Sequence, residues 1–140
     1  MDRTANSDVS DVRDVVDHAL ARRAVLADLC TGRVTTTDVC DASPYLGRAA
    51  KAYGVRTDRT CPVCRREPLW EVPWVYGDAL GDASGSARSL AQVRALAARH
   101  PEFRVYEVEV CHECGWNHLV RSWRTGTPGL VPARRTRVAR

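Results

Sequence analysis

Cys61-Pro62-Val63-Cys64 and Cys111-His112-Glu113-Cys114 are the stretches that decide how this chain folds. Each stretch places two thiols with two residues between them, so that both sulfurs of a tight turn can point at one ion. Together they supply four soft ligands, the set that Zn²⁺ accepts in a closed tetrahedral site. Gly115 follows the second pair, and a glycine can adopt the positive φ that such a turn requires. The sequence therefore predicts one zinc site whose ligands are Cys61, Cys64, Cys111 and Cys114.

Two other uses of such cysteine pairs have to be weighed against zinc. Thioredoxin-like redox proteins carry the same spacing, but their attacking thiol lies at a helix N-terminus directly after a buried strand. Residues 55–60, which precede the first pair here, are polar and indicate a turn. Redox dithiols and structural disulfides also leave two matched pairs without a common role, so the spacing favours zinc. Neither His112 nor His118 is required as a ligand.

The long connection between the two pairs indicates a folded insertion. Residues 65–110 separate the pairs, and a minimal zinc ribbon has a shorter connection. Within this segment, 69–76 predicts a strand with alternating aromatic and apolar side chains, and Pro73 indicates that this strand is an edge strand or a bulged one. Residues 77–86 predict a flexible loop, and 87–100 predict a helix.

Two further strands are expected around the second pair. Residues 103–110 alternate in polarity, with Glu107 and Glu109 on one side of the strand, and residues 116–123 are rich in aromatic and apolar side chains. The second pair would then form the tip of a β-hairpin, as in a zinc ribbon. Core packing is the expected role of the tryptophans, with stacking on a base or partner as the alternative. These residues are Trp70, Trp74, Trp116 and Trp123.

The first third of the chain has a helical pattern. Apolar side chains recur at three- and four-residue steps over 11–31 and predict a helix. A short helix is expected over 38–41 with Thr37 as its N-cap, and the Ser-Pro dipeptide that opens 43–53 predicts a third helix. This succession also occurs in helix-turn-helix proteins, although a helical lobe that packs on the ribbon or docks on a partner has the same pattern.

Two cysteines lie outside the pairs. Cys30 and Cys40 stand among apolar neighbours in the helical segment, where we expect them to be small buried hydrophobic residues. The sequence shows no signal peptide and no apolar run long enough to span a bilayer. We therefore expect a cytoplasmic protein without a membrane partner, in a compartment where thiolates bind metal rather than cross-link. The oligomeric state is left open.

The positive charge of the chain is unevenly distributed. The formal net charge is +4, and basic residues concentrate beside the first cysteine pair and in the C-terminal tail. Such clusters attract phosphate backbones, although exposed arginine is ordinary in a protein of this charge. The candidate nucleic-acid contacts are Arg48, Lys51, Arg56, Arg59, Arg65, Arg66, Arg134, Arg135, Arg137 and Arg140.

We find no sequence signature of catalysis. There is no nucleophile beside a recognisable base, no HExxH and no Walker loop, and four cysteines leave no open position on a metal. Ser84, Ser86 and Arg88 form the one candidate anion site, in a loop of small residues that leads into a helix N-terminus. A solvated loop with a serine cap explains the same residues.

These patterns define an expected domain organisation. The segments are a disordered N-terminus at 1–10, a helical lobe at 11–55, a zinc-ribbon-like domain with an inserted strand and helix at 56–124, and a basic disordered tail at 125–140. The expected fold class is α+β: an N-terminal helical lobe of two to three helices, followed by a zinc-ribbon-like antiparallel sheet with an inserted helix. The core is modest, and zinc would add stability.

Several motifs occur in one order along the chain. They are His18-Ala19-Leu20-Ala21-Arg22-Arg23, Val39-Cys40-Asp41-Ala42-Ser43-Pro44-Tyr45-Leu46, the first cysteine pair, Ser84-Gly85-Ser86-Ala87-Arg88, and Cys111 through Leu119. In this order they resemble a family of small uncharacterised actinobacterial zinc-ribbon-like proteins, over residues 11–124. The resemblance implies a bacterial cytoplasmic protein and carries no established activity.

From these observations we expect a non-enzymatic zinc protein with four cysteine ligands that acts as an interaction module. Its expected partner is a protein within a larger assembly such as the transcription machinery, with nucleic acid as a further possible partner. The alternatives are a regulator that binds DNA or RNA directly, and a CxxC thiol redox protein.

Overall fold

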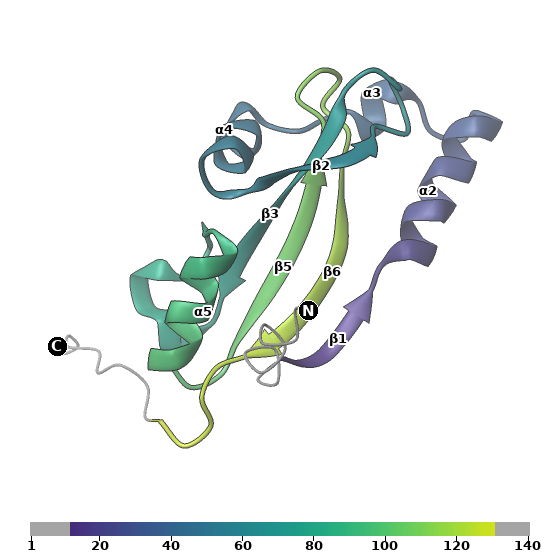
Figure 1. Cartoon of the computed structure of the whole chain (residues 1–140). Helices are drawn as coiled ribbons and strands as arrows, with labels where there is room; N and C mark the ends of the chain where they lie inside the picture. Colours follow the sequence, from purple (N-terminus) through teal and green to yellow (C-terminus); the bar gives the residue numbers. More distant parts are fainter. Residues whose placement is uncertain (1–11, 131–140) are drawn as a thin grey trace, which may run out of the picture.

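The computed structural model describes residues 12–130 and shows an α+β protein built on a six-stranded antiparallel sheet (Figure 1). In chain order, the elements are β1 (Arg13–Asp17), α2 (Ala19–Thr31), α3 (Thr36–Val39), α4 (Pro44–Tyr53), β2 (Val55–Thr60), β3 (Pro68–Tyr76), the 3₁₀ helix η1 (Asp78–Ala83), β4 (Ser86–Ala87), α5 (Leu90–Arg99), β5 (Phe103–Val110) and β6 (Asn117–Thr125). The α+β class expected from the sequence is confirmed.

The order of the strands brings the two cysteine pairs to one end of the sheet. The order is β1-β6-β5-β3-β2, and β4 pairs with β3 beyond the end of β2. Strands β3 and β5 pair without interruption from Trp70–Val110 to Tyr76–Arg104. The first cysteine pair lies just before β3 and the second just after β5. Because the strands are antiparallel, the β2–β3 and β5–β6 loops meet at the same end (Figure 1).

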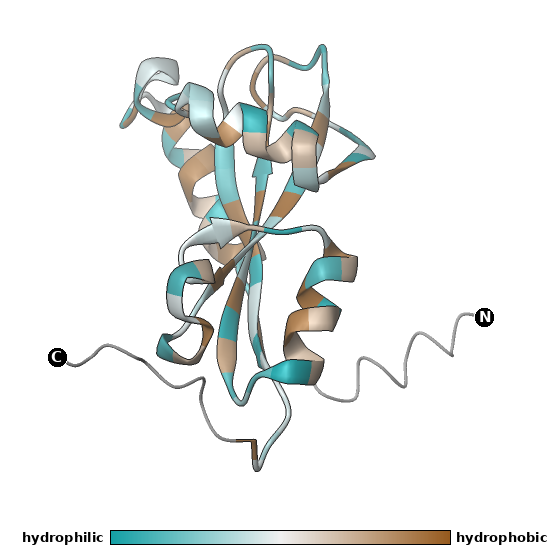
Figure 2. Ribbon diagram, turned by 90° about the vertical axis from the view of Figure 1, so that its left-hand side faces the viewer, coloured by the Kyte–Doolittle hydropathy of each residue, from teal (hydrophilic) through white to brown (hydrophobic). Residues whose placement is uncertain are grey.

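Side chains alternate between the two faces of the sheet, as the alternating brown and teal segments along the strands show (Figure 2). On one face, Val72 of β3 and Val110 of β5 pack with Ala49 and Ala50 of α4. On the other face, Val75 of β3 belongs to a cluster built from η1, α5, β5 and β6. The remaining buried members of that cluster are Leu80, Val93, Leu96, Ala97, Phe103, Val105 and Trp123.

Both edge strands differ from the expectation. Residues 13–17, predicted as the start of a long helix, form β1 and pair with β6, and α2 begins only at Ala19. Residues 55–60, predicted as a turn, form β2. Most side chains of both strands are exposed, so neither strand shows the apolar alternation of a half-buried strand. The helix prediction for the first segment and the turn prediction for the second are therefore wrong.

The predicted helix boundaries are confirmed at α4 and shifted at α3. Helix α4 is capped by Ser43, whose hydroxyl accepts from a backbone N–H, and proline occupies its first turn. Helix α3 begins at Thr36 because Thr35 and Asp38 form a reciprocal capping box. The predicted range 38–41 and the predicted cap at Thr37 are wrong.

The segment before α5 is a short strand rather than the first turn of the helix. Ser86 and Ala87 pair with β3, and the capping residue of α5 is Ser89, which exchanges hydrogen bonds with Gln92. The helix therefore starts at Leu90, three residues later than the predicted residue 87.

Strand β3 lies inside the sheet, so the edge position that Pro73 indicated is wrong. The carbonyl of Pro73 accepts from the backbone N–H of Arg88, 3.0 Å away. In a strand the N and C=O of one residue point to the same side, so the missing N–H of Pro73 faces the β2/β4 side. The pairing of β2 ends at Glu71 and that of β4 begins at Trp74. The proline thus occupies a position where no ladder hydrogen bond is lost.

The start of the expected tail is part of the fold. Thr125 is the last residue of β6 and is buried, and Thr127 bonds to the carbonyls of Ala97 and His100 at the end of α5. The predicted disordered N-terminus, and the tail from residue 131 onward, lie outside the described residues. Within 12–130, no helix is both long and apolar enough to cross a membrane.

Candidate metal centre

The four cysteines of the two pairs converge at the end of the sheet where the β2–β3 and β5–β6 loops meet. Each side chain offers one sulfur, and all four sulfurs lie within 4.8 Å of one another. Cys61 and Cys111 are buried, while Cys64 and Cys114 are half-buried. Two cysteine pairs that lie 47 positions or more apart in sequence thus form a single cluster that could hold a metal ion.

The spacing of the sulfurs fits a tetrahedral ion better than it fits disulfides. The Sγ atoms of Cys61 and Cys114 are 3.7 Å apart, as are those of Cys64 and Cys111. Four sulfurs held at about 2.3 Å from one Zn²⁺ would lie about 3.8 Å from each other. A disulfide needs about 2.05 Å, and all four cysteines are free.

The backbone of each loop supports its first sulfur. The N–H of Val63 lies 3.4 Å from the Cys61 sulfur, and the N–H of Glu113 lies 3.3 Å from the Cys111 sulfur. Donors aimed at a sulfur stabilise its thiolate form, the form that binds metal. The donor set and its hydrogen bonds therefore fit zinc, which would be held by these four residues as a structural ion.

Gly115 completes the second loop in a conformation that other residues rarely adopt. Its φ is +90°, and a Cβ built there would lie 3.0 Å from the carbonyl oxygen of Cys40. The expected positive φ after the second pair is confirmed. The glycine also permits a close approach between this loop and the chain after α3, which the sequence does not reveal.

The four thiols differ in acidity without metal. Burial raises the pKa of Cys61 and of Cys111, and it raises the pKa of Cys114 to about 12. Burial also acts on Cys64, but backbone N–H donors of Arg66 and Glu67 outweigh it and lower its pKa to about 7. A bound Zn²⁺ deprotonates coordinating thiols outright, so metal binding releases protons and weakens as the pH falls.

Apolar side chains enclose the sulfurs. Leu69 and Trp116 are fully buried against Cys61 and Cys111. Half-buried side chains of α2, of α3 and of its C-cap pack against this cluster: Val25, Leu26, Val39 and Cys40. The first helices therefore pack directly on the cysteine end of the sheet. The core role predicted for Trp116 and Trp123 is confirmed, whereas Trp70 and Trp74 are half-buried beside α4.

Neither neighbouring histidine belongs to the cluster of four sulfurs. His112 is exposed, and its Nε2 lies 2.9 Å from the carbonyl oxygen of Gly47 in α4. Its ring also meets Trp70 edge-on. His118 stacks on Trp116, with 5.9 Å between the ring centroids. The second loop thus touches α4 through His112, and this contact links the cysteine cluster to the helix.

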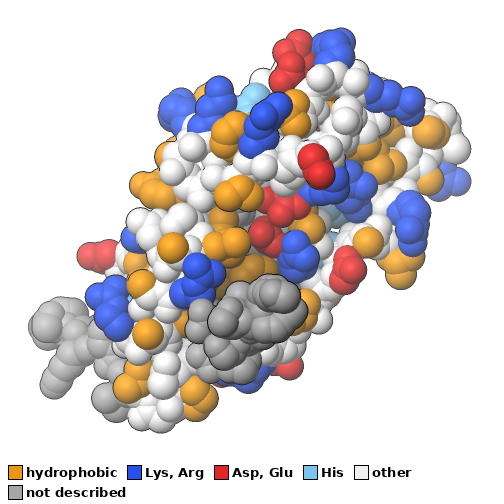
Figure 3. Space-filling model, in the orientation of Figure 1, with side chains coloured by type: hydrophobic (Ala, Val, Ile, Leu, Met, Phe, Trp, Pro, Cys, Tyr) orange, Lys and Arg blue, Asp and Glu red, His pale blue; other side chains and the backbone are white. Residues whose placement is uncertain are grey.

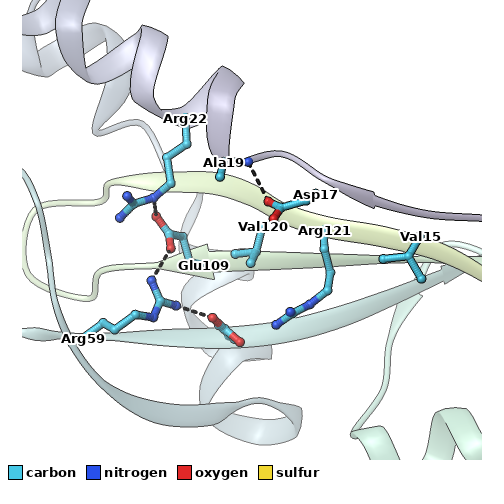
Figure 4. A pocket seen from close by; sticks show the side chains of 9 residues that line it. Val15, Asp17, Ala19, Arg22, Arg59, Glu109, Val120 and Arg121 are labelled. Carbon is cyan, nitrogen blue, oxygen red and sulfur yellow. Dashed lines mark hydrogen bonds and ion pairs between the residues drawn. The ribbon is translucent and has the colours of Figure 1, made fainter. Parts of the chain in front are cut away.

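A buried glutamate stands two residues before the second cysteine pair in the sequence. Glu109 of β5 is fully buried and receives hydrogen bonds from Arg22 Nε (2.7 Å), Arg59 Nη1 (3.0 Å) and Trp116 Nε1 (2.8 Å). Figure 4 shows Arg22 and Arg59 approaching this carboxylate from opposite sides. Burial raises the pKa of Glu109, but these three donors outweigh burial and the pKa is lowered. Through these hydrogen bonds the carboxylate connects α2 and β2 with Trp116, the residue just before β6.

The same face of the sheet is hollowed beside this network. A cavity of about 360 Å³ is lined by α2 and by the strands β1, β2, β3, β5 and β6. Arg59 also pairs with Glu71, and Arg121 pairs with Glu107 at 2.7 Å. Figure 3 shows acidic side chains at the centre of this face with basic side chains around them. Positive and negative groups are paired in the cavity, so it has no strong preference for one sign of ligand.

Within residues 12–130, the predicted nucleic-acid contacts come from α4, β2 and the first cysteine loop. Arg48 and Lys51 are exposed on α4, and Arg56 is exposed on β2. Arg59 is turned inward onto Glu109 and Glu71. Arg66 pairs with Glu113 at 3.0 Å, and Arg65 is exposed beside it. Arg134, Arg135, Arg137 and Arg140 lie outside the described residues.

The serines of the candidate anion site bond within their own loop. Ser84 accepts from the backbone N–H of Gly77, and Ser86 donates to the carbonyl of Ala83 at 2.6 Å. Arg88 donates from Nε to the Ser86 hydroxyl at 2.9 Å. The N-terminus of α5 is capped by Ser89, the residue after Arg88, whose hydroxyl accepts from the backbone N–H of Gln92.

Sequence reasoning missed several residues of this centre. Cys40 was expected to be an isolated buried thiol, yet its sulfur lies 3.5 Å from that of Cys114. Glu109 was placed on a strand face by alternation, without an indication that this face is buried. Arg22 carries no local signal for its contact, because its partner stands 87 residues away. These contacts depend on how distant elements pack and not on spacing along the chain.

Comparison with known proteins places the chain among actinobacterial relatives. Residues 9–139 match the family of unknown function DUF5318. Uncharacterized proteins from Mycobacterium bovis and from two strains of Mycobacterium tuberculosis are each 50% identical over 111 residues, covering 79% of this chain and 81% of the relative. No solved structure matches the chain. The predicted resemblance to small actinobacterial proteins is confirmed.

Proposed function

The chain belongs to the family of unknown function DUF5318, and we propose that it is a non-enzymatic protein whose four-cysteine zinc centre supports a docking surface. The observation that carries this proposal is the cluster of four sulfurs, contributed equally by two loops, in which two separations between the loops are 3.7 Å, close to the value for a tetrahedral site. In this proposal the two loops and the strands that carry them form a zinc-ribbon-like unit at one end of the sheet.

The ligand set supports a structural role rather than a catalytic one. Four thiolates fill the coordination sphere of zinc, whereas a catalytic zinc keeps one position open for water or substrate. The redox alternative is weakened because the first pair lies in the loop between β2 and β3 and not at a helix N-terminus. The cytoplasm is the compartment that suits such thiolates, because its reducing environment disfavours disulfides.

The proposed docking surface lies on α4, next to the second cysteine loop. Tyr45 is 57% exposed, and its ring lies 5.8 Å from that of Trp74. Arg48 and Lys51 are exposed on the same helix. Aromatic and arginine side chains are enriched in protein interfaces, and the positive charge favours an acidic partner. Because His112 contacts Gly47, zinc would hold the loop that supports this helix.

A protein partner is favoured over direct binding of nucleic acid. Two of the predicted phosphate contacts, Arg59 and Arg66, are already paired with glutamates. Of the six predicted contacts within residues 12–130, the other four, Arg48, Lys51, Arg56 and Arg65, remain exposed for a phosphate backbone. We propose a partner within a macromolecular assembly such as the transcription machinery.

Binding to the host RNA polymerase tests this role. We expect the purified zinc-loaded chain to bind purified RNA polymerase after nuclease treatment, and the double variant Arg48→Glu/Lys51→Glu to bind at least about tenfold more weakly. The matched control is Arg23→Glu/Arg33→Glu, which makes the same charge change around α2. Binding that requires nucleic acid and falls steeply with salt would instead support a direct nucleic-acid binder.

A further inference from the structure

A fifth thiol lies in contact with the proposed zinc ligands. The sulfur of Cys40 is 3.5 Å from that of Cys114, closer than the 3.7 Å that separates Cys114 from Cys61. Cys40 is not among the four sulfurs that all lie within 4.8 Å of one another. It is therefore a neighbour of one ligand rather than a ligand itself. Cys30, the other cysteine outside the pairs, is exposed on α2.

The fold holds Cys40 at this position through its neighbours in sequence. The backbone N–H of Ala42 donates to the carbonyl of Gly115 at 3.0 Å. The side chain of Asn117 donates to the carboxylate of Asp41 at 2.9 Å. Both contacts join the chain after α3 to the second cysteine loop. The approach of the two sulfurs is thus built into the packing of that loop.

The two thiols also share an opening to solvent. A cavity of about 430 Å³ is lined by Thr36, Thr37, Cys40, Val63, Cys64 and Cys114. The other two ligands, Cys61 and Cys111, are each 1% exposed and do not line it. A small polar oxidant such as hydrogen peroxide fits this space and reaches Cys40 and Cys114, together with Cys64.

We propose that Cys114 and Cys40 form a peroxide-responsive thiol pair, in which a reversible disulfide withdraws one ligand and releases the metal. The proposal rests on the proposed zinc centre. Oxidation needs the sulfurs to approach from 3.5 Å to about 2.05 Å. Cys40 is the C-cap of a four-residue helix, so a short shift of its side chain and the loop after it is sufficient.

The chemistry balances with one hydroperoxide. The Cys114 sulfur bonds to one peroxide oxygen as the O–O bond breaks, and the other oxygen leaves as water, which gives a sulfenic acid. The Cys40 sulfur then bonds to the Cys114 sulfur as the S–O bond breaks, and the hydroxide leaves as water with the proton from Cys40. The Cys114 thiolate and the Cys40 thiol lose two electrons in total, and the peroxide takes up these electrons, the proton of Cys40 and one proton from solvent to become two waters.

Mass spectrometry and metal release test this pair. Zinc-loaded wild type, Cys40→Ser and the matched control Cys30→Ser are treated with hydrogen peroxide, and free thiols are then alkylated. Wild type and Cys30→Ser are expected to form a Cys40–Cys114 disulfide, lose zinc, and regain about all of it after thiol reductant and zinc. Without Cys40, Cys114 passes to irreversible sulfinic acid, so Cys40→Ser is expected to regain roughly one tenth as much zinc.

Two results would overturn the proposal. One is a wild-type disulfide within the four ligands, such as Cys61–Cys64, in place of Cys40–Cys114. The other is a Cys40→Ser protein that regains zinc as fully as wild type. Zinc content is measured before oxidation, so the two proposals are separable. A chain that holds zinc but forms no such disulfide overturns only the thiol pair, and one that forms it without ever binding zinc overturns the zinc centre and supports the pairing.

Discussion

Replacing Cys111 with serine is expected to abolish zinc binding and cooperative folding together. The side chain is 1% exposed and supplies one of four sulfurs to a closed cluster. Structural zinc contributes an apparent free energy of about 10–16 kcal/mol, comparable with the roughly 5–15 kcal/mol stability of a whole domain. Loss of one ligand therefore removes enough free energy to unfold the chain. Circular dichroism during heating would show no sharp transition.

Matched variants separate loss of a ligand from loss of a thiol. Cys30→Ser removes an exposed thiol outside the cluster and is expected to keep both zinc and the wild-type melting curve. Cys64 is half-buried, and Cys64→His is expected to retain more zinc than Cys64→Ser because three thiolates and one imidazole also form structural zinc sites. A Cys111→Ser protein that melts like wild type would show that the fold does not depend on the metal.

The second large effect is expected at Glu109. In Glu109→Gln, Arg22 and Arg59 lose their shared negative partner in a fully buried position. Breaking a buried ion pair costs about 3–5 kcal/mol, and we expect about 3 kcal/mol because the arginine side chains are 27% and 42% exposed and can regain water. Chemical denaturation at pH 7 measures this free energy. Glu113→Gln, which breaks an exposed pair with Arg66, is the control and should cost less than about 1 kcal/mol.

The stabilisation of the fold by Glu109 should weaken as the pH falls. Its pKa in the folded protein lies below the ordinary value of 4.5, so the folded state favours the charged carboxylate. The stabilisation is therefore complete above pH 4.5 and is lost as the pH falls through the lower folded pKa. The stability difference between wild type and Glu109→Gln should be constant from pH 8 to pH 6 and shrink below pH 4.5. A difference that grows on acidification would contradict the role of the carboxylate.

The four clustered cysteines could be predicted from sequence because their signal is local. Each pair fixes two sulfurs within one turn, and two such pairs leave few other arrangements. The capping signal of Ser43-Pro44 is local as well, and α4 begins where it predicts. The sequence therefore predicts those features whose residues lie close together along the chain.

The errors in the two wrongly assigned strands have a common physical origin at the edges of the sheet. Both wrongly assigned strands, β1 and β2, are edge strands in the order β1-β6-β5-β3-β2. An edge strand pairs on one side only and here exposes most of its side chains, so a polar sequence is tolerated. Val12, Val15 and Val16 fit the period of a helix better than that of a strand, because Val15 and Val16 are adjacent. Only the presence of β6 as a partner decides between them.

The surroundings of the metal centre could not be predicted for a different reason. Glu109 lies on a strand that alternates in polarity, which normally places glutamates in solvent. It is buried because Arg22, Arg59 and Trp116 arrive from three other parts of the chain. The contact between Cys40 and Cys114 likewise spans 74 residues. Tertiary packing creates these contacts, and no local pattern records them.

The zinc content of the purified chain is the most direct test of a metal site shared by the two loops. Elemental analysis of wild type, Cys61→Ser and Cys111→Ser would give the number of ions per chain. We predict about one zinc ion per wild-type chain, and loss of that ion in each variant although the two substitutions lie in different loops. A wild-type chain without zinc, in which Cys61 and Cys64 cycle reversibly between dithiol and disulfide, would contradict the shared site and identify a thiol redox protein.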